Sequence, residues 1–202
     1  MNQGVTMNLK KLIFITITAL IGVFTMEAQN QTKKENKTVV VYFSHTGEQY
    51  SVGVVTEGNT AKIAKIIAAK VGADLFEIVP EKPYPSKYKP CIDLAQTELR
   101  QNVRPAYKGD IDTSKYETIY IGYPIWWGEM PMVVFSFLDK HDLNGKTILP
   151  FCTHEGSGIS GTDRTLAKKY PKATVKTPLA VRGSVAQNNK SESEKSVSNW
   201  LK

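Results

Sequence analysis

Residues 38–47 read TVVVYFSHTG and are the clearest structural signal in the chain. The first six are a continuous run of β-branched and aromatic side chains, typical of a strand buried on both faces of a parallel sheet. The run ends in the polar segment Ser44–Gly47, which is typical of a loop. Apolar residues then recur at helical spacing over Asn59–Val71, and Gly72 marks the helix end. The stretch therefore predicts a strand, a loop and a helix.

The rest of the chain alternates in the same way between strand-like and helix-like segments. The predicted strands are Asp74–Val79, Thr118–Gly122, Thr147–Cys152 and Thr174–Val181. The predicted helices are Ile92–Val103, one that follows Pro131, Gly161–Tyr170 and Ser191–Leu201, while the four prolines of residues 80–92 predict a loop. This alternation is typical of right-handed βαβ units and a parallel sheet, so the fold class is α/β. Pro178 then requires an edge strand, and Pro150 a strand end or a bulge.

The N-terminal segment has the three parts of a secretory signal peptide. Lys10 and Lys11 precede an apolar run from Leu12 to Phe24, and Ala28 is a small residue at the expected cleavage site. A membrane span needs roughly 20 apolar residues, so this run is short for a permanent anchor. An uncleaved anchor is the alternative, because Met26 fits the cleavage pattern poorly.

We therefore expect residues 1–28 to be a signal peptide, 29–37 a polar linker and 38–202 a single domain. We expect the mature protein to be exported to the periplasm and to keep no stable membrane anchor. N-terminal mass analysis of protein from the native host should give a chain that begins near Gln29. An intact Met1 or Met7 on soluble protein would contradict this expectation.

The formal net charge of the chain is +7 at pH 7, and its basic residues are scattered rather than clustered. A basic balance can indicate an acidic partner, a nucleic acid or an anionic membrane. The chain has no zinc-ligand spacing and no basic-aromatic stripe, so we expect neither a nucleic-acid partner nor a metal site. The charge is better explained by a solvated, moderately basic surface.

In an open parallel sheet, ligands bind beyond the carboxyl ends of the strands, where the strand order reverses. The first loop carries hydroxyls in Ser44–Thr46, and Gly58-Asn59-Thr60 opens the next helix, whose amides and dipole favour a phosphate. A plain capped turn is the alternative, because Asn and Thr are common N-cap residues. Gly53–Thr60 has P-loop spacing, but Asn59 replaces the lysine, which favours a single phosphate over a nucleoside triphosphate.

The loops after the third and fourth strands carry the other candidate residues. Trp126 and Trp127 are adjacent, and exposed indoles are costly unless they cover something flat, such as an isoalloxazine ring; alternatively, one packs under the next helix. Residues 152–158 offer backbone N–H groups and hydroxyls to a polar ring edge, although His154 and Glu155 could simply cap the loop. Gly156–Gly161 matches G-x-G-x-x-G, but it does not directly follow the strand, and too little chain remains for a second nucleotide-binding half.

These loops resemble those of the flavodoxin family, and the resemblance covers Thr38–Leu201. Ser44–Gly47 with Asn59-Thr60 is similar to the family's phosphate loop S-x-T-G-N-T, interrupted by about ten residues. Residues 122–128 and 151–158 resemble the loops that cover the two faces of the flavin. The resemblance implies a three-layer sandwich with a five-stranded parallel sheet of order 2-1-3-4-5, and FMN as cofactor. The implied cofactor-binding residues are Ser44, His45, Thr46, Asn59, Thr60, Pro124, Ile125, Trp126, Trp127, Gly128, Thr153, His154, Glu155, Gly156, Ser157 and Gly158.

In this strand order, Cys91 follows the second strand and Cys152 the fourth, and two other strands lie between these two in the sheet. The strand ends are about 14 Å apart at ~4.8 Å per strand, beyond the ~7 Å limit for bridging Cα atoms. A disulfide is therefore the less favoured alternative, although the chain is predicted to be exported.

Three features depart from the flavodoxin pattern: no stacking tyrosine in the second flavin loop, the insertion Glu48–Glu57, and a basic rather than acidic chain. The first of three functional readings is an FMN oxidoreductase that takes hydride from NADH or NADPH and reduces a quinone-like or nitro/azo acceptor. The missing tyrosine favours this reading, because it leaves one flavin face open. The alternatives are a one-electron carrier that docks to protein partners, and a binding module without flavin. No catalytic residue is identified.

Overall fold

Strand β1 (Thr38–Tyr42) lies inside a parallel sheet whose order is β10-β8-β7-β1-β4, with β9 also paired to β8. The computed structural model describes Met1 and residues 37–202, so the predicted cleavage site and most of the predicted linker lie outside the described residues. The other strands of this sheet are β4 (Asp74–Glu77), β7 (Thr118–Pro124), β8 (Thr147–His154), β9 (Thr174–Val175) and β10 (Leu179–Arg182). The predicted order 2-1-3-4-5 is confirmed, with the fifth strand in two pieces.

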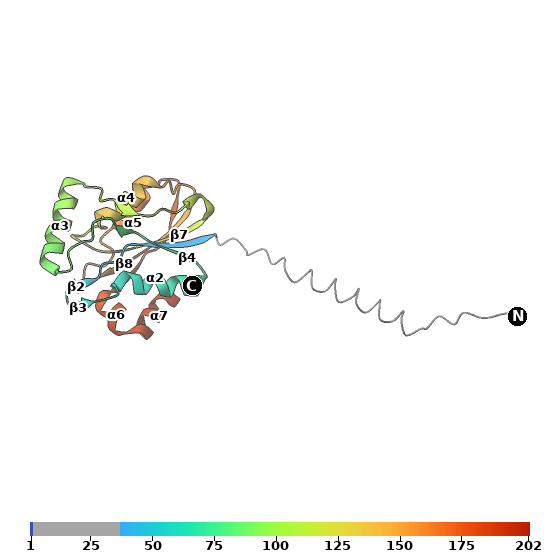
Figure 1. Ribbon diagram of the computed structural model, residues 1–202, viewed down its shortest axis with the longest axis horizontal. Coiled ribbons are helices and arrows are strands. Elements are labelled where there is room, and N and C mark those ends of the chain that lie inside the picture. Colours follow the sequence, from blue (N-terminus) through green and yellow to red (C-terminus); the bar gives the residue numbers. More distant parts are fainter. Residues whose placement is uncertain (2–36) are drawn as a thin grey trace. The chain divides into compact units, whose positions relative to one another are not determined.

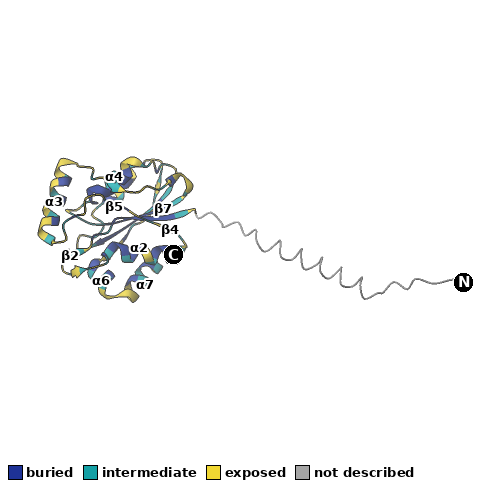
Figure 2. Ribbon diagram, in the orientation of Figure 1, coloured by how far each residue is buried: buried dark blue, intermediate teal, exposed yellow. Residues whose placement is uncertain are grey.

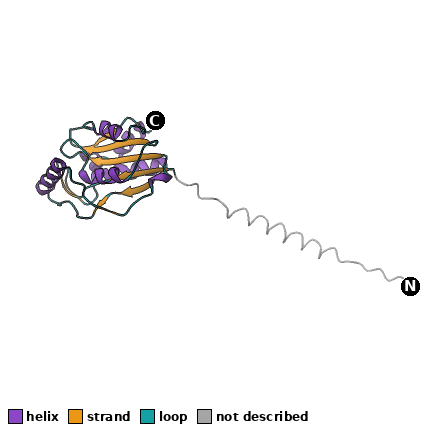
Figure 3. Ribbon diagram, turned by 90° about the horizontal axis from the view of Figure 1, so that it is seen from above, coloured by secondary structure: helices purple, strands orange, loops and turns teal. Residues whose placement is uncertain are grey.

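Helices cover both faces of the sheet, which gives the predicted three layers (Figure 1). On one face lie α2 (Asn59–Val71), α6 (Gly183–Asn188) and α7 (Lys190–Trp200). On the other lie α3 (Tyr88–Gln101), α4 (Met132–Lys140) and α5 (Thr162–Lys169). A short 3₁₀ helix, η2 (Thr113–Lys115), precedes β7. Seen from above, the strands lie side by side with helices over both faces (Figure 3).

The core consists of two apolar layers that share β1. Val39 and Val41 pack toward the α3–α5 face, whereas Val40 packs toward α2 with Ile63 and Ile67. All three valines are fully buried, and buried residues concentrate on the strands and the inner sides of the helices (Figure 2). This confirms the prediction of a strand buried on both faces. Helix α2 also has its predicted bounds, because Gly72 adopts the left-handed conformation (φ 65°) that ends a helix.

Several predicted bounds were wrong. Helix α3 begins at Tyr88 rather than Ile92, because Pro90 sits in the first turn, where no intrahelical hydrogen bond is lost. Strands β7 and β8 each run two residues further than predicted, to Pro124 and His154. Two small antiparallel pairs were not predicted: β2 (Gly47–Gln49) with β3 (Gly53–Val55), and β5 (Val79–Pro80) with β6 (Tyr107–Lys108).

Pro150 was predicted to lie at a strand end or a bulge, and this prediction was wrong. It lies inside β8, opposite Ile121. In a parallel strand, every second residue bonds to the same neighbouring strand. The Ile148 carbonyl accepts from Lys176 N on the side away from β7, so the position of the missing N–H of Pro150 faces that side as well. On that side, pairing is interrupted between β9 and β10, where Pro178 lies. The sheet therefore loses no hydrogen bond through the lack of an N–H at Pro150.

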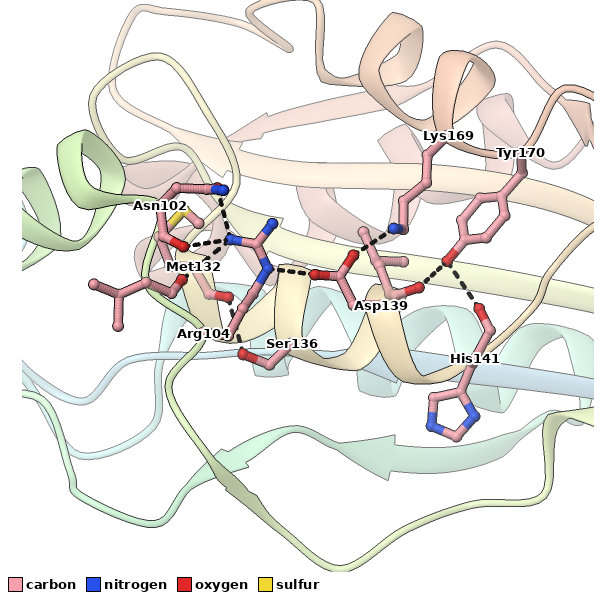
Figure 4. Close-up of polar contacts among 10 residues, drawn as sticks. Asn102, Arg104, Met132, Ser136, Asp139, His141, Lys169 and Tyr170 are labelled. Carbon is pink, nitrogen blue, oxygen red and sulfur yellow. Dashed lines mark hydrogen bonds and ion pairs between the residues drawn. The ribbon is translucent and has the colours of Figure 1, made fainter.

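Polar contacts tie together the helices on the α3–α5 face. Arg104 and Lys169 approach the Asp139 carboxylate from two sides, and the Tyr170 hydroxyl donates to the carbonyls of Leu138 and His141 (Figure 4). The ion pairs are partly exposed, so each contributes little free energy. Within the described part of the chain, no helix is both long and apolar enough to cross a membrane.

Candidate cofactor site

A cleft of about 300 Å³ opens where the loops after β1, β7 and β8 meet the β2–β3 hairpin and the start of α3. Ten of the predicted cofactor-binding residues line it: His45, Asn59, Pro124, Ile125, Trp126, Trp127, Thr153, His154, Glu155 and Ser157. Six further residues that the sequence reasoning missed also line it: Glu48, Gln49, Tyr50, Tyr88, Cys91 and Ile92. The other six predicted residues lie in the same loops without lining the cleft: Ser44, Thr46, Thr60, Gly128, Gly156 and Gly158.

The start of α2 is held against the first loop by hydroxyl groups. Ser44 Oγ accepts a hydrogen bond from the backbone N of Ala61 at 3.0 Å, which caps the helix. The hydroxyls of Thr60 and Thr153 are 2.8 Å apart, and both residues are almost fully buried. This contact joins the start of α2 to the end of β8.

Donors and an acceptor remain available at this junction. The amides of Asn59 and Thr60 are in the first helical turn and have no intrahelical acceptor. The amides of Ser44, His45 and Thr46 likewise donate to no protein acceptor in the described part of the chain. Asn59 Oδ1 is a buried acceptor that receives no hydrogen bond there. Free amides at the start of a long helix suit an anion, and the orphaned oxygen suits a hydroxyl donor.

Gly58 makes this junction possible. A Cβ atom at this position would lie 2.2 Å from Ser44 Oγ and 2.4 Å from the carbonyl oxygen of His45, both within overlap distance. Its φ of −69° is open to any residue, so the requirement for glycine is one of space rather than of backbone conformation. The absence of a side chain lets the first loop and the helix start converge.

His45 is buried and fixes neighbouring segments around the cleft. Its Nδ1 accepts from Gln49 Nε2 at 2.8 Å, and its Nε2 donates to the carbonyl of Pro85 at 3.1 Å. Burial lowers the pKa of His45, and the bond to Pro85 only partly opposes this. A neutral ring with its proton on Nε2 satisfies both contacts. His45 therefore joins the β2–β3 hairpin to the segment before α3.

The two tryptophans have different roles. Trp126 packs inward with its ring edge-on to Phe43 and Tyr84, at centroid distances of 5.5 and 5.0 Å. The expectation that one indole packs inside is met, although its partners are these rings rather than the following helix. Trp127 is 49% exposed, and its Nε1 donates to the carbonyl of Ile92 in α3 at 2.8 Å.

The backbone at Trp127 is strained. Trp127 (φ 53°) and Gly128 (φ 80°) are the central residues of a two-residue turn closed by paired hydrogen bonds between Trp126 and Glu129. Positive φ at both positions is typical of a type I′ turn, in which Asn-Gly is favoured over a tryptophan. Strain of this kind persists where the surroundings impose it, and it is frequent at ligand sites.

The loop after β8 is organised by its own side chains. His154 Nδ1 accepts from the backbone N of Gly156 at 2.9 Å and of Gly158 at 3.1 Å. These two amides are therefore not among the backbone N–H groups that the loop can offer to a ligand, because the imidazole already uses them. Burial lowers the pKa of His154, nearby Arg182 adds to this, and Glu155 opposes it. The ring is therefore neutral with its proton on Nε2.

Glu155 is also a structural residue of this loop. Its carboxylate accepts from the backbone N of Ser184 at 2.5 Å and lies 3.7 Å from the guanidinium of Arg182. Both His154 and Glu155 thus have the loop-capping role that was the alternative to a chemical one. They still line the cleft, so their remaining polar atoms can face a ligand.

Cys91 and Cys152 are free thiols, and both are buried. Burial raises the pKa of each to about 12, with a further contribution from Glu98 at Cys91. Neither thiol is therefore ionised at neutral pH. Within the described residues, no cluster of three or more His, Cys, Asp or Glu side chains could hold a metal ion.

The missed residues come from two segments that lack a flavodoxin-like motif. The hairpin supplies Glu48, Gln49 and Tyr50, and the first turns of α3 supply the others, Tyr88 among them. A partial signal was present, because Gly47 precedes the insertion, Gly53 lies within it, and glycines commonly bound hairpin strands. Nothing in the sequence indicated that α3 would lie against this hairpin.

Comparisons with known proteins agree with this architecture. The family model described as flavodoxin matches residues 37–202. A candidate flavoprotein from Bacteroides eggerthii is 32% identical, with 82% of this chain and 95% of that chain covered and a TM-score of 0.64. One from Bacteroides uniformis is 31% identical, with 83% and 99% covered and a TM-score of 0.65.

A flavoprotein from Lactobacillus acidophilus, solved in complex with FMN, is 22% identical, with 83% of this chain and 99% of that chain covered and a TM-score of 0.60. At that identity the likeness shows the fold alone. No curated protein matches the chain. The match over residues 37–202 and the two relatives above 30% identity show that the chain belongs to the flavodoxin family.

Proposed function

We propose that this protein binds FMN in the cleft and is an oxidoreductase, which takes hydride from NADH or NADPH and reduces a quinone-like or nitro/azo acceptor. The observation that carries the proposal is the composition of the cleft. Free backbone amides lie at the start of α2, next to the loop after β1, and partly exposed aromatic rings line the opening of the cleft. An anionic group and a flat ring in one ligand match this combination.

For the phosphate end, we assign Ser44, Thr46, Asn59 and Thr60, through their hydroxyls and the amides described above. The buried oxygen of Asn59 would accept from a hydroxyl of the ligand. One helix start offers space for one terminal phosphate, and residues 37–202, which the structure describes, contain one parallel sheet with one such site at its carboxyl edge. This favours FMN over FAD, and the relative from Lactobacillus acidophilus that was solved with FMN is consistent with that choice.

For the ring end, Trp127 supplies an apolar surface, and the loop after β8 supplies polar groups. Because His154 Nδ1 already accepts two backbone hydrogen bonds, its proton is on Nε2, which can donate to a polar ring edge. Bound FMN would supply the two-electron chemistry, and the protein residues would bind and orient it.

A reductase is favoured over a carrier because one side of the cleft lacks aromatic cover. The lining residues from the end of β8 and the loop after it are Thr153, His154, Glu155 and Ser157, and none of them is aromatic. Hydride transfer requires the nicotinamide to lie flat on the flavin, so an open face is needed. A one-electron carrier that docks to a protein partner is the second candidate, and the basic charge of the chain would suit an acidic partner.

Purified protein is expected to show flavin absorbance, and the released cofactor should elute as FMN in chromatography. Anaerobic NADH or NADPH should bleach the bound flavin, and a quinone should restore its colour. A colourless protein that cannot be reconstituted with FMN would contradict the cofactor assignment. Bound FMN that neither nucleotide bleaches would instead favour the carrier.

A further inference from the structure

We infer that Tyr50 and Tyr88 form the binding face for an uncharged, planar aromatic electron acceptor, and that the β2–β3 hairpin sets acceptor specificity. This inference rests on the proposed reductase function and names the substrate class of the same cleft. It concerns residues outside the three loops that resemble the flavodoxin motifs, in the insertion and the following helix.

The two rings lie together at the opening of the cleft. Their centroids are 5.9 Å apart with an interplanar angle of 31°, so the two rings are neighbours with a moderate tilt between them. Both residues line the cleft, and Tyr50 is 61% exposed. A large aromatic ring held in water is unfavourable unless it contacts a partner, and flat aromatic ligands are the partners that such a surface stacks with.

The hairpin that carries Tyr50 is fixed at its base. The backbone N of Glu48 donates to the carbonyl of Ser86 at 2.7 Å, and the Glu48 carboxylate accepts from the backbone N of Tyr88 at 2.8 Å. Gly47 has a φ of 96°, and a Cβ there would lie 2.5 Å from the carbonyl oxygen of Ser86. The hairpin is thus locked to the start of α3, and the two tyrosines are positioned before any ligand arrives. Such preorganisation lowers the entropy cost of binding.

The charge of the cleft selects the class of acceptor. No lysine or arginine is among the residues that line it, and the only carboxylates are those of Glu48 and Glu155. Arg182 lies 3.7 Å from Glu155 but does not line the cleft, so an anionic acceptor would approach Glu48 without a lining cation to pair with, which disfavours it. The phosphate of FMN differs in this respect, because helix-start amides would hold it. An uncharged quinone-like ring therefore fits the opening better than a sulfonated or carboxylated one.

The test uses FMN-loaded protein and two probes, 2-methyl-1,4-naphthoquinone and a sulfonated naphthoquinone. Equilibrium dialysis gives the dissociation constant of each probe, and reoxidation of photoreduced protein gives the dependence on quinone concentration without a nicotinamide donor. Tyr50→Ala should weaken binding of the neutral quinone roughly 3- to 10-fold, the range expected for loss of one aromatic contact. Unsubstituted protein should bind the neutral probe more tightly than the sulfonated one.

Two variants are matched controls. Tyr50→Phe keeps the ring and should bind the quinone within about 2-fold of the unsubstituted protein. Val54→Ala changes a residue of the same hairpin that is 78% exposed and does not line the cleft, so it should leave binding unchanged. A Tyr50→Ala protein that retains FMN and binds the quinone normally would overturn the inference and leave the proposed function standing. Protein without FMN absorbance would overturn both.

Discussion

Replacing Ser44 or Thr60 by alanine is expected to weaken FMN binding roughly 10- to 150-fold, while riboflavin binding changes little. A hydrogen bond to a charged group is worth about 1.5–3 kcal/mol, and riboflavin lacks the phosphate that would receive it. Ser44 Oγ already accepts from the amide of Ala61, so its own hydrogen remains free to donate to the phosphate. Fluorescence titration of the apoprotein with each flavin measures the two dissociation constants.

Two further variants make this experiment specific. Thr56→Ala removes an exposed hydroxyl four residues before Thr60, and it should leave both flavins unaffected. Trp127→Asn removes a ring surface, so it should weaken FMN and riboflavin by similar factors. Thermal unfolding of each apoprotein separates a lost helix cap from a lost ligand contact. If Ser44→Ala weakened both flavins equally, the phosphate would have to bind elsewhere.

The central elements could be predicted from the sequence because local and tertiary preferences coincide in them. Strand β1 consists of β-branched and aromatic residues and is buried on both faces, so its pattern needs no knowledge of its neighbours. Helix α2 has both an apolar periodicity and a glycine that adopts the left-handed conformation at its end. Where the apolar pattern and the residue that ends the element agree, the sequence predicts the bounds of the element as well.

Other parts depend on contacts between segments distant in sequence. The lengths of β7 and β8 are set by their mutual pairing up to Pro124 and Thr153, which no local pattern reports. The split of the fifth strand was only partly visible, through Pro178. The cleft could be located because sheet topology fixes which loops meet, but its aromatic opening comes from an insertion locked onto α3 by Glu48.

The loop after β8 illustrates a different limit. Its glycines suggested free amides, yet Gly156 (φ 123°) and Gly158 (φ 63°) turn their N–H groups onto His154. Positive φ at both positions produces this arrangement, and composition alone does not distinguish it from an open anion site. The identity of candidate loops is therefore more predictable than the direction of their hydrogen bonds.

Gly58→Ala is expected to lower the free energy of unfolding by about 1–3 kcal/mol and to reduce FMN affinity roughly 100-fold or more. The added methyl group would overlap Ser44 Oγ and the carbonyl oxygen of His45, so the first loop must move away from α2. The amides of loop and helix would then no longer converge, and losing two charge-assisted hydrogen bonds corresponds to this drop in affinity. Chemical denaturation and FMN titration measure the two effects.

Two comparisons identify backbone overlap as the cause. Adding Ser44→Gly to Gly58→Ala removes the hydroxyl but keeps the overlap with the His45 carbonyl at 2.4 Å, so the double variant should recover neither stability nor FMN binding. Gly53→Ala adds a methyl group that meets no atom within 4 Å, at a residue with φ of 90°. It should cost conformational energy in the hairpin and leave FMN binding intact. Gly58→Ala protein with unchanged stability and FMN affinity would mean that the loop and helix need not converge to hold the phosphate.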